Sequence, residues 1–235
     1  MPQVEAVLFD YGRTLVTFTY PRDELLAVIE RFRPAIAAAS GVAAPRAEEI
    51  MEKVLLPLES VIENPDETEV TYLDLYADAW RKAGIDIPDE LRYEILDAEQ
   101  QVWDDVAAVD PEARDVLAWL GEHDIKTALC SNAPFPPEMM LRQVERNGIA
   151  SLVDAIVFSS ELGLRKPAPG VYRATLEKLG VDAARSLFVG DRVREDYSGP
   201  LAVGMRAVIC TAHAAEPPPA GTPTISSLAE LPRLL

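Results

Sequence analysis

Polar side chains directly follow two of the most apolar segments of this chain. Asp10 follows the segment 4–9, and the pair Ser131 and Asn132 follows the segment 125–130. A carboxylate can attack an electrophilic centre and form a covalent intermediate, which divides one difficult displacement into two easier steps. A hydroxyl group can hold the oxygens of the group being transferred. These residue types predict nucleophilic catalysis, with Asp10 as the nucleophile and Ser131 as an oxygen-binding group.

A lysine stands directly before a predicted helix further along the chain. Lys166 lies in the stretch LRKPAP, and the N-terminus of the helix that follows favours anions. The ammonium of Lys166 would keep Asp10 ionised. Together with Ser131 and backbone N–H groups, it would also hold the oxygens of a metaphosphate-like transition state. Lys166 is therefore predicted to be the cationic partner of the nucleophile in a phosphoryl-transfer site.

Oxygen ligands for a divalent cation occur near the same segments. Asp191 follows the apolar residues 187–189 and Gly190, and Asp196 lies five residues beyond Asp191. Mg²⁺ prefers carboxylates, carbonyl oxygens and water as ligands. The bound metal would also offset the negative charge that several carboxylates bring to one place. We expect Mg²⁺ to be bound by Asp10, the carbonyl oxygen of Gly12, Asp191 and Asp196.

From about residue 107 onward, short apolar segments alternate with helical patterns. Buried strands are predicted at 125–130, 155–158, 187–189 and 207–210, with a further strand at 4–9. Helices are predicted at 111–122, 136–147, 169–179 and 195–203, and several begin with proline, as the first helical turn prefers. This alternation is typical of an α/β fold with a doubly wound parallel sheet, whose strands present reactive groups at their carboxyl ends.

The segment between about residues 17 and 107 has a different pattern. Apolar residues recur at helical spacing almost throughout, and no strand pattern interrupts them. The simplest interpretation is an all-α bundle, residues 17–107, inserted after the first strand of a core formed by residues 1–16 and 108–235. Its hinges would lie near Thr17 and Ala107.

The composition limits the class of protein. The 235 residues are 49% hydrophobic, enough to bury a sizeable core, and no apolar stretch reaches the roughly 18 to 20 residues of a membrane-spanning helix. The N-terminus lacks a basic and then apolar signal pattern, so we expect a cytoplasmic protein. A formal net charge of −17 would repel nucleic acids and anionic membranes. We expect a small-molecule substrate, phosphorylated or halogenated, and the oligomeric state stays open.

The order and spacing of these residues resemble the haloacid dehalogenase-like (HAD) hydrolase superfamily over essentially the whole chain. The segments FDYGRTL, LCSNAP, LRKPAP and VGDRVRED are similar to its four motifs. The resemblance implies a Rossmann-like core with a helical cap inserted after the first motif, as in subfamily I with a C1 cap. It also implies a Mg²⁺-dependent phosphatase that forms an aspartyl-phosphate. Within these motifs, Arg13 and Asn132 are candidate substrate-binding residues. Asn132 could also orient the first-motif loop, or equally close a turn at the strand end.

The chain departs from the family pattern at Gly12. Most phosphatases of the superfamily carry a second aspartate at this position, which protonates the leaving oxygen and later activates water, and a glycine where Arg13 stands. A general acid contributes roughly 10²- to 10⁴-fold, so alkyl phosphate esters should react slowly. Acyl phosphates, anhydrides, aryl phosphates or a carbon–halogen bond should suffer least. Asp23 or Glu24 could replace the acid, although charges in the first turn of a helix are the simpler interpretation.

Three functions remain open at this point. A phosphatase fits the complete set of motifs. A 2-haloacid dehalogenase fits Gly12, since members that displace halide also lack the second aspartate, but they need no metal and usually lack an acid at the position of Asp191. A weakly active or non-catalytic ligand-binding protein also fits Gly12, but it has little use for Asp10, Lys166 and Asp191 around one crevice.

The cysteines and tryptophans are expected to be structural. Both cysteines fall within apolar segments at no metal-ligand spacing, so we expect buried apolar side chains at Cys130 and Cys210. Large aromatic side chains on apolar helical faces usually pack in a core. We expect this of Trp80, Trp103 and Trp119.

Overall fold

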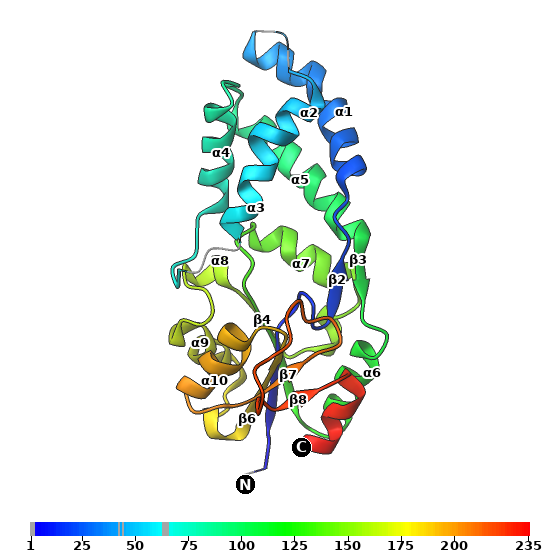
Figure 1. Ribbon diagram of the computed structural model, residues 1–235, viewed down its shortest axis with the longest axis vertical. Helices are drawn as coiled ribbons and strands as arrows, with labels where there is room; N and C mark the ends of the chain where they lie inside the picture. The colour runs from blue at the N-terminus through cyan, green and yellow to red at the C-terminus, as the bar shows by residue number, and fades with distance from the viewer. Residues whose placement is uncertain (1–2, 42, 44, 63–65) are drawn as a thin grey trace.

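The computed structural model describes residues 3–41, 43, 45–62 and 66–235, which form two lobes stacked along the long axis of the molecule (Figure 1). One lobe holds a six-stranded sheet and is called the sheet lobe; both chain ends lie on it. The other is called the helical lobe. It contains α1 (Arg22–Ser40), α2 (Ala47–Ile50), the π-helical turn η1 (Met51–Leu55), α3 (Leu56–Ile62), α4 (Tyr72–Lys82) and α5 (Asp89–Val106).

The six-stranded sheet is parallel throughout, and β1 lies near its middle. The spatial order is β5 (Ala155–Phe158), β4 (Lys126–Ser131), β1 (Ala6–Phe9), β6 (Ser186–Gly190), β7 (Arg206–Cys210) and β8 (Thr224–Ile225). The connecting helices are α6 (Ala113–Glu122), α7 (Pro137–Arg146), η2 (Ala150–Leu152), α8 (Ser159–Leu162), α9 (Pro169–Leu179), η3 (Ala183–Arg185), η4 (Val193–Ser198), α10 (Gly199–Ala202) and η5 (Leu228–Leu234). The α/β fold predicted from alternating strands and helices is confirmed.

Side chains alternate along β1 and build a core on each face of the sheet. Val7 and Phe9 pack in one cluster with α6 and α7, whereas Ala6 and Leu8 pack in another with α9. Strands buried on both faces read as continuous apolar runs, which is why the sequence shows no alternation here. Both cysteines are buried free thiols, as predicted: Cys130 and Cys210.

The helical lobe has its own apolar core. Trp80 is fully buried in this core, as predicted, and packs edge-on against Tyr76 at 6.0 Å between ring centroids. Trp119 and Trp103 are half-buried. Trp119, on α6, packs against a core cluster of the sheet lobe, and Trp103 packs at the edge of the helical-lobe core. Among the described residues, no helix has both the length and the apolar composition needed to cross a lipid bilayer.

The chain passes between the lobes through two short strands that lie side by side. β2 (Val16–Phe18) pairs antiparallel with β3 (Ala107–Val109). The hinge positions predicted at Thr17 and Ala107 therefore fall in this ribbon, which the sequence did not indicate. Three-residue strands are too short to show an alternating pattern in the sequence.

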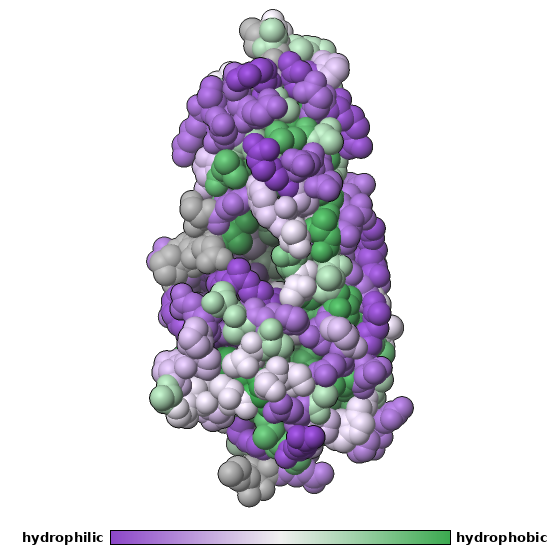
Figure 2. All heavy atoms as spheres, turned by 45° about the vertical axis from the view of Figure 1, so that its right-hand side comes forward, coloured by the Kyte–Doolittle hydropathy of each residue, from purple (hydrophilic) through white to green (hydrophobic). Residues whose placement is uncertain are grey.

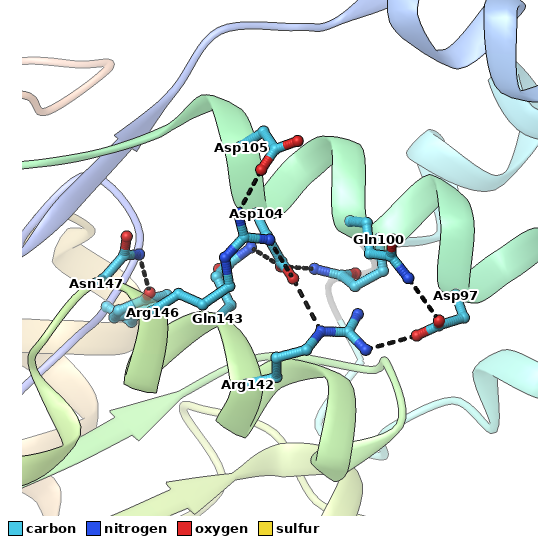
Figure 3. A network of polar contacts seen from close by, with 10 residues as sticks. Asp97, Gln100, Asp104, Asp105, Arg142, Gln143, Arg146 and Asn147 are labelled. Atoms are coloured by element: carbon cyan, nitrogen blue, oxygen red, sulfur yellow. Dashed lines mark hydrogen bonds and ion pairs between the residues drawn. The ribbon is translucent and has the colours of Figure 1, made fainter.

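A buried polar network joins α5 of the helical lobe to α7 of the sheet lobe (Figure 3). Asp104 accepts hydrogen bonds from Arg142 Nε at 3.1 Å and from Gln143 Nε2 at 3.0 Å, and Arg142 Nη1 also donates to Asp97 Oδ1 at 2.6 Å. A buried carboxylate is costly unless its oxygens are hydrogen-bonded, and here both are. This network holds the two lobes in a defined relative position.

A second connection lies on the opposite side of the lobe junction. Residues Thr68 and Leu164 form an antiparallel bridge, and Glu69 accepts a hydrogen bond from the Ser159 hydroxyl. Arg165 Nη2 also donates to the carbonyl oxygen of Ile62 at 2.7 Å. Contacts on both sides of the junction thus hold the helical lobe over the carboxyl edge of the sheet.

Candidate active site

A cavity of about 350 Å³ lies between the lobes, over the carboxyl ends of the central strands. Figure 2 shows the surface hollowed at the lobe junction, with hydrophobic residues beside the hollow. The cavity brings together segments that are far apart in the sequence, since Asp10, Ser131 and Lys166 all line it. Arg13, Asn132 and Asp196 line it as well.

Lys166 is the central cation of the site. Its Nζ lies 2.6 Å from Asp10 Oδ1 and 2.7 Å from Asp196 Oδ1, and the side chain is only 2% exposed. Burial disfavours the ammonium, but the two carboxylates outweigh this and hold the pKa of Lys166 well above its ordinary value. Lys166 therefore stays charged beside the predicted nucleophile.

Asp196 shapes the acidic loop as well as pairing with Lys166. Its Oδ2 accepts hydrogen bonds from the backbone N–H groups of Asp191 at 3.1 Å and Arg192 at 2.9 Å. The helix predicted at 195–203 begins earlier than expected, as the π-helical segment η4, and this places Asp196 on its first turns. Gly190 is required at the strand end, because a Cβ there would overlap the Asp196 carboxyl group.

Three carboxyl groups meet at one point of the site. Asp10, Asp191 and Asp196 offer oxygen atoms that all lie within 4.8 Å of one another. Oδ2 of Asp191 is buried and has no hydrogen-bond partner among the described residues. Three carboxylates and one ammonium leave two net negative charges. A divalent cation with a preference for oxygen ligands fits both the unpartnered oxygen and this charge.

Burial and the neighbouring carboxylates raise the pKa values of Asp10 and Asp191. Burial raises the pKa of Asp10 to about 6, with a further rise from Asp196, although Lys166 opposes it. Burial, and then Asp10 and Asp196, raise the pKa of Asp191 to about 7. Protonation at neutral pH would weaken both groups as ligand and nucleophile. A cation bound between them would favour their ionised forms.

Ser131 and Asn132 follow β4 as predicted, but they make different contacts. Ser131 is buried in the cavity wall. The Asn132 amide accepts a hydrogen bond from the backbone N–H of Lys166 at 2.7 Å and donates to its carbonyl oxygen at 3.0 Å. Asn132 therefore orients the backbone that carries Lys166, and not the first-motif loop that the sequence suggested.

The nucleophile loop is held by its backbone and by Tyr11. The N–H of Asp10 donates to the carbonyl of Val189 at 2.9 Å, and the buried Tyr11 hydroxyl accepts a hydrogen bond from Asn147 Nδ2 at 2.8 Å. Arg13 has a φ of 59°, in the left-handed region that glycine adopts most easily. An L side chain adopts this backbone conformation only at a cost in energy, and Arg13 lines the cavity wall.

The helical lobe adds no acid to the cavity wall among the described residues. Its lining side chains are Phe18, Ile62, Gln100 and Trp103. Asp23 and Glu24, considered as substitutes for an acid at position 12, are exposed in the first turn of α1 and do not line the cavity. Asp23 and Glu24 are therefore better explained as favourable charges in the first turn of a helix.

Several cavity residues were not found from the sequence. Arg165, next to Lys166, is buried in the wall and pairs with Glu69 at 3.4 Å. Glu195 lines the cavity beside Asp196 and pairs with Arg194 at 3.3 Å. Both stand next to residues that the motifs identify, which was the available signal. The helical-lobe residues have no such signal, because helical periodicity does not separate cavity walls from the packed core.

Comparisons with known proteins identify the family of this chain. A family model for haloacid dehalogenase-like hydrolases matches residues 4–204. The N-acylneuraminate-9-phosphatase of Mus musculus is 27% identical, over 100% of this chain and 95% of that protein. The ribulose-1,5-bisphosphate 5-phosphatase of Halopiger xanaduensis is 31% identical over 99 residues, but the match spans only 42% of this chain and 41% of that relative.

Solved structures share the fold over almost the whole chain. A HAD phosphatase from Thermococcus onnurineus superposes with a TM-score of 0.66 at 21% identity, covering 98% of this chain and 97% of the other. A 2-haloacid dehalogenase from Pseudomonas syringae pv. Tomato superposes with a TM-score of 0.70, also at 21% identity, covering 99% and 98%. The match of the family model over most of the chain, on a site built from the same four segments, shows that the chain belongs to the haloacid dehalogenase-like hydrolases.

Proposed function

We propose that this hydrolase is a Mg²⁺-dependent phosphatase that acts through an aspartyl-phosphate on a small phosphorylated metabolite with a good leaving group. The observation that carries the proposal is the unpartnered Oδ2 of Asp191, buried beside Asp10 and Lys166. A metal-independent displacement of halide would leave this oxygen without a role. Mg²⁺ would be held by Asp10, the carbonyl oxygen of Gly12 and Asp191, with Asp196 beside them, and would stabilise negative charge on the phosphoryl oxygens.

The reaction would follow from the positions of the side chains. A carboxylate oxygen of Asp10 attacks phosphorus, the bond from phosphorus to the leaving oxygen breaks, and that oxygen departs with the electron pair. Lys166 and Ser131 hold the phosphoryl oxygens during transfer. Water then cleaves the acyl phosphate, which releases inorganic phosphate and regenerates Asp10. The helical lobe, residues 17–107, would act as the cap that excludes bulk water.

A substrate screen tests this function. We expect Mg²⁺-dependent release of phosphate from acetyl phosphate and an aryl phosphate, and slow release from a sugar phosphate, because Gly12 supplies no proton to a poor leaving group. The variant Asp10→Asn is the blank, since its amide cannot act as the nucleophile. 2-Chloropropionate is included with and without Mg²⁺. Halide release without metal would replace the proposal with a dehalogenase, and no turnover of any substrate would favour a non-catalytic ligand-binding protein.

Asp191→Asn should weaken metal binding. The substitution replaces the negatively charged carboxylate, which carries the unpartnered Oδ2, by a neutral amide. We therefore expect the Mg²⁺ concentration for half-maximal activity to rise by about tenfold or more. Calorimetric titration of the free protein with Mg²⁺ should show the same loss of affinity. Asp182→Asn is a matched control, because Asp182 is exposed and lies outside the acidic cluster. Equal Mg²⁺ affinity in both variants would contradict the assignment of Asp191.

A further inference from the structure

We propose, on the basis of the phosphatase function above, that the substrate is a phosphate ester of a phenol, with Phe18 and Trp103 as the residues that select its ring. The proposal rests on two features of the cavity: an aromatic wall beside the nucleophile loop, and the place of that wall next to Gly12.

The aromatic wall runs from the nucleophile loop into the helical lobe. The rings of Tyr11 and Phe18 meet edge to face with centroids 6.4 Å apart, and those of Phe18 and Trp103 do so at 6.3 Å. Phe18 is 37% exposed although it lines a cavity. Exposed aromatic surface in a concave site is stabilised when a ligand covers it, and a flat ring can do so by edge-to-face or offset stacking.

Phe18 lies next to position 12, which carries no general acid in this chain. A Cβ added to Gly12 would have Phe18 Cε2 as its nearest neighbour, at 3.7 Å. The leaving group therefore departs past an apolar ring instead of a proton donor. A phenolic oxygen can leave as an anion without such a donor, whereas an alkoxide cannot do so readily. The aromatic wall and the absence of an acid at position 12 thus both favour a phenolate as the leaving group.

The group transfer balances without a further reactant. The bond from phosphorus to the phenolic oxygen breaks, the phenolate keeps the electron pair, and it takes a proton from solvent after release. Arg13 and Arg192 also line the cavity, and their positive charge would favour the departing anion.

Four substrates separate ring binding from leaving-group quality. Phenyl phosphate has a ring and a good leaving group, benzyl phosphate has a ring and a poor one, acetyl phosphate has a good leaving group and no ring, and glycerol phosphate has neither. With Mg²⁺ present, we expect phenyl phosphate to have the highest kcat/KM. Benzyl phosphate should react slowly yet inhibit competitively with a Ki close to the KM of phenyl phosphate, because it uses the same wall.

Variants of the wall complete the test. Trp103→Leu should raise the KM for phenyl phosphate by about tenfold relative to the KM for acetyl phosphate, because the ring loses its stacking partner. Phe18→Leu should also raise the KM for phenyl phosphate relative to the KM for acetyl phosphate. Because the Phe18 side chain is partly exposed, this variant can replace Trp103→Leu if the latter does not fold. Trp119→Leu is the matched control, since Trp119 packs against the sheet lobe outside the cavity.

The outcomes distinguish this inference from the function on which it rests. If acetyl phosphate is not hydrolysed with Mg²⁺, the phosphatase function fails and the inference fails with it. If acetyl phosphate is hydrolysed but benzyl phosphate does not inhibit and Phe18→Leu leaves the KM ratio unchanged, the aromatic selection alone is wrong. A preference for glycerol phosphate over phenyl phosphate would also overturn the inference.

Discussion

Replacing Gly12 by aspartate should raise kcat/KM for alkyl phosphate esters by about 10²- to 10⁴-fold, the usual contribution of a general acid. Position 12 has room for the new side chain. Its backbone is outside the left-handed region, and an added Cβ would make an ordinary van der Waals contact with Phe18. Benzyl phosphate is the substrate of choice, because its aromatic ring suits the cavity while its leaving oxygen requires a proton.

The gain should depend on the proton of the new side chain. Gly12→Asn is the matched control, with the same size and no acid, and it should leave the rate with benzyl phosphate near that of the natural protein. Glu195→Gln tests the acid of the cavity wall to which no role in the reaction or in metal binding is assigned. It should not change the ratio of the turnover rates for aryl and alkyl phosphates. An equal gain from asparagine and aspartate would show that position 12 acts by shape and not by proton transfer.

The same substitution should alter the covalent intermediate. In the natural protein no acid at position 12 assists the water that cleaves the aspartyl-phosphate, so the intermediate on Asp10 should accumulate during turnover of acetyl phosphate. Gly12→Asp should lower its steady-state level. Acid quenching followed by mass analysis of the peptide that contains Asp10 would measure it. Steady turnover with no detectable intermediate in the natural protein would count against this expectation.

Replacing Glu99 by glutamine should stabilise the fold by an amount that grows with pH. Glu99 lies in α5, is 5% exposed, and accepts a hydrogen bond from the Tyr76 hydroxyl at 3.0 Å. Burial raises the pKa of Glu99 from its ordinary 4.5 to about 8, although the Tyr76 hydrogen bond opposes this rise. The folded protein therefore retains a proton that the unfolded chain loses.

The sign of the effect follows from proton linkage. Between pH 4.5 and about 8 the folded state binds more protons at Glu99 than the unfolded state, so stability falls as pH rises and levels off above that window. The full loss is on the order of 3 to 5 kcal/mol. Glutamine resembles the protonated carboxyl group and does not titrate, so Glu99→Gln avoids this loss.

Thermal unfolding at several pH values would measure this effect. At about pH 8.5 the Tm of Glu99→Gln should exceed that of the natural protein by roughly 10 °C, and at about pH 5 the two should nearly coincide. Glu94→Gln, an exposed glutamate on the same helix, should have no pH-dependent effect. A constant difference in Tm between Glu99→Gln and the natural protein at all pH values would exclude titration of Glu99 as the cause.

The sheet and the reactive groups could be predicted because their signals are local. A buried strand ending on a polar side chain appears directly in the sequence at Asp10 and at Asp191. In a parallel sheet, such ends must lie on one edge. The structure brings these two acids together with Lys166 for that reason. Gly12 could also be recognised as a departure, since one residue at a fixed distance from Asp10 decides whether an acid is present.

The remaining features depend on contacts between distant segments. The role of Asn132 follows from two hydrogen bonds to the Lys166 backbone, and the burial of Glu99 follows from the packing of α5 against α4. Phe18 and Trp103 look like ordinary apolar residues in the sequence. Only their positions in the folded chain show that they line the cavity.

The ribbon of β2 and β3 has a consequence for protein engineering. Because the chain leaves and re-enters the sheet lobe at neighbouring points, Val16 opposite Val109, the intervening segment can be exchanged as one cassette without moving Asp10. A graft of the corresponding segment from a relative would have to restore two further attachments, at Asp104 and at Glu69. Chimaeras designed across this ribbon would then change which molecules are accepted while keeping the same chemical machinery.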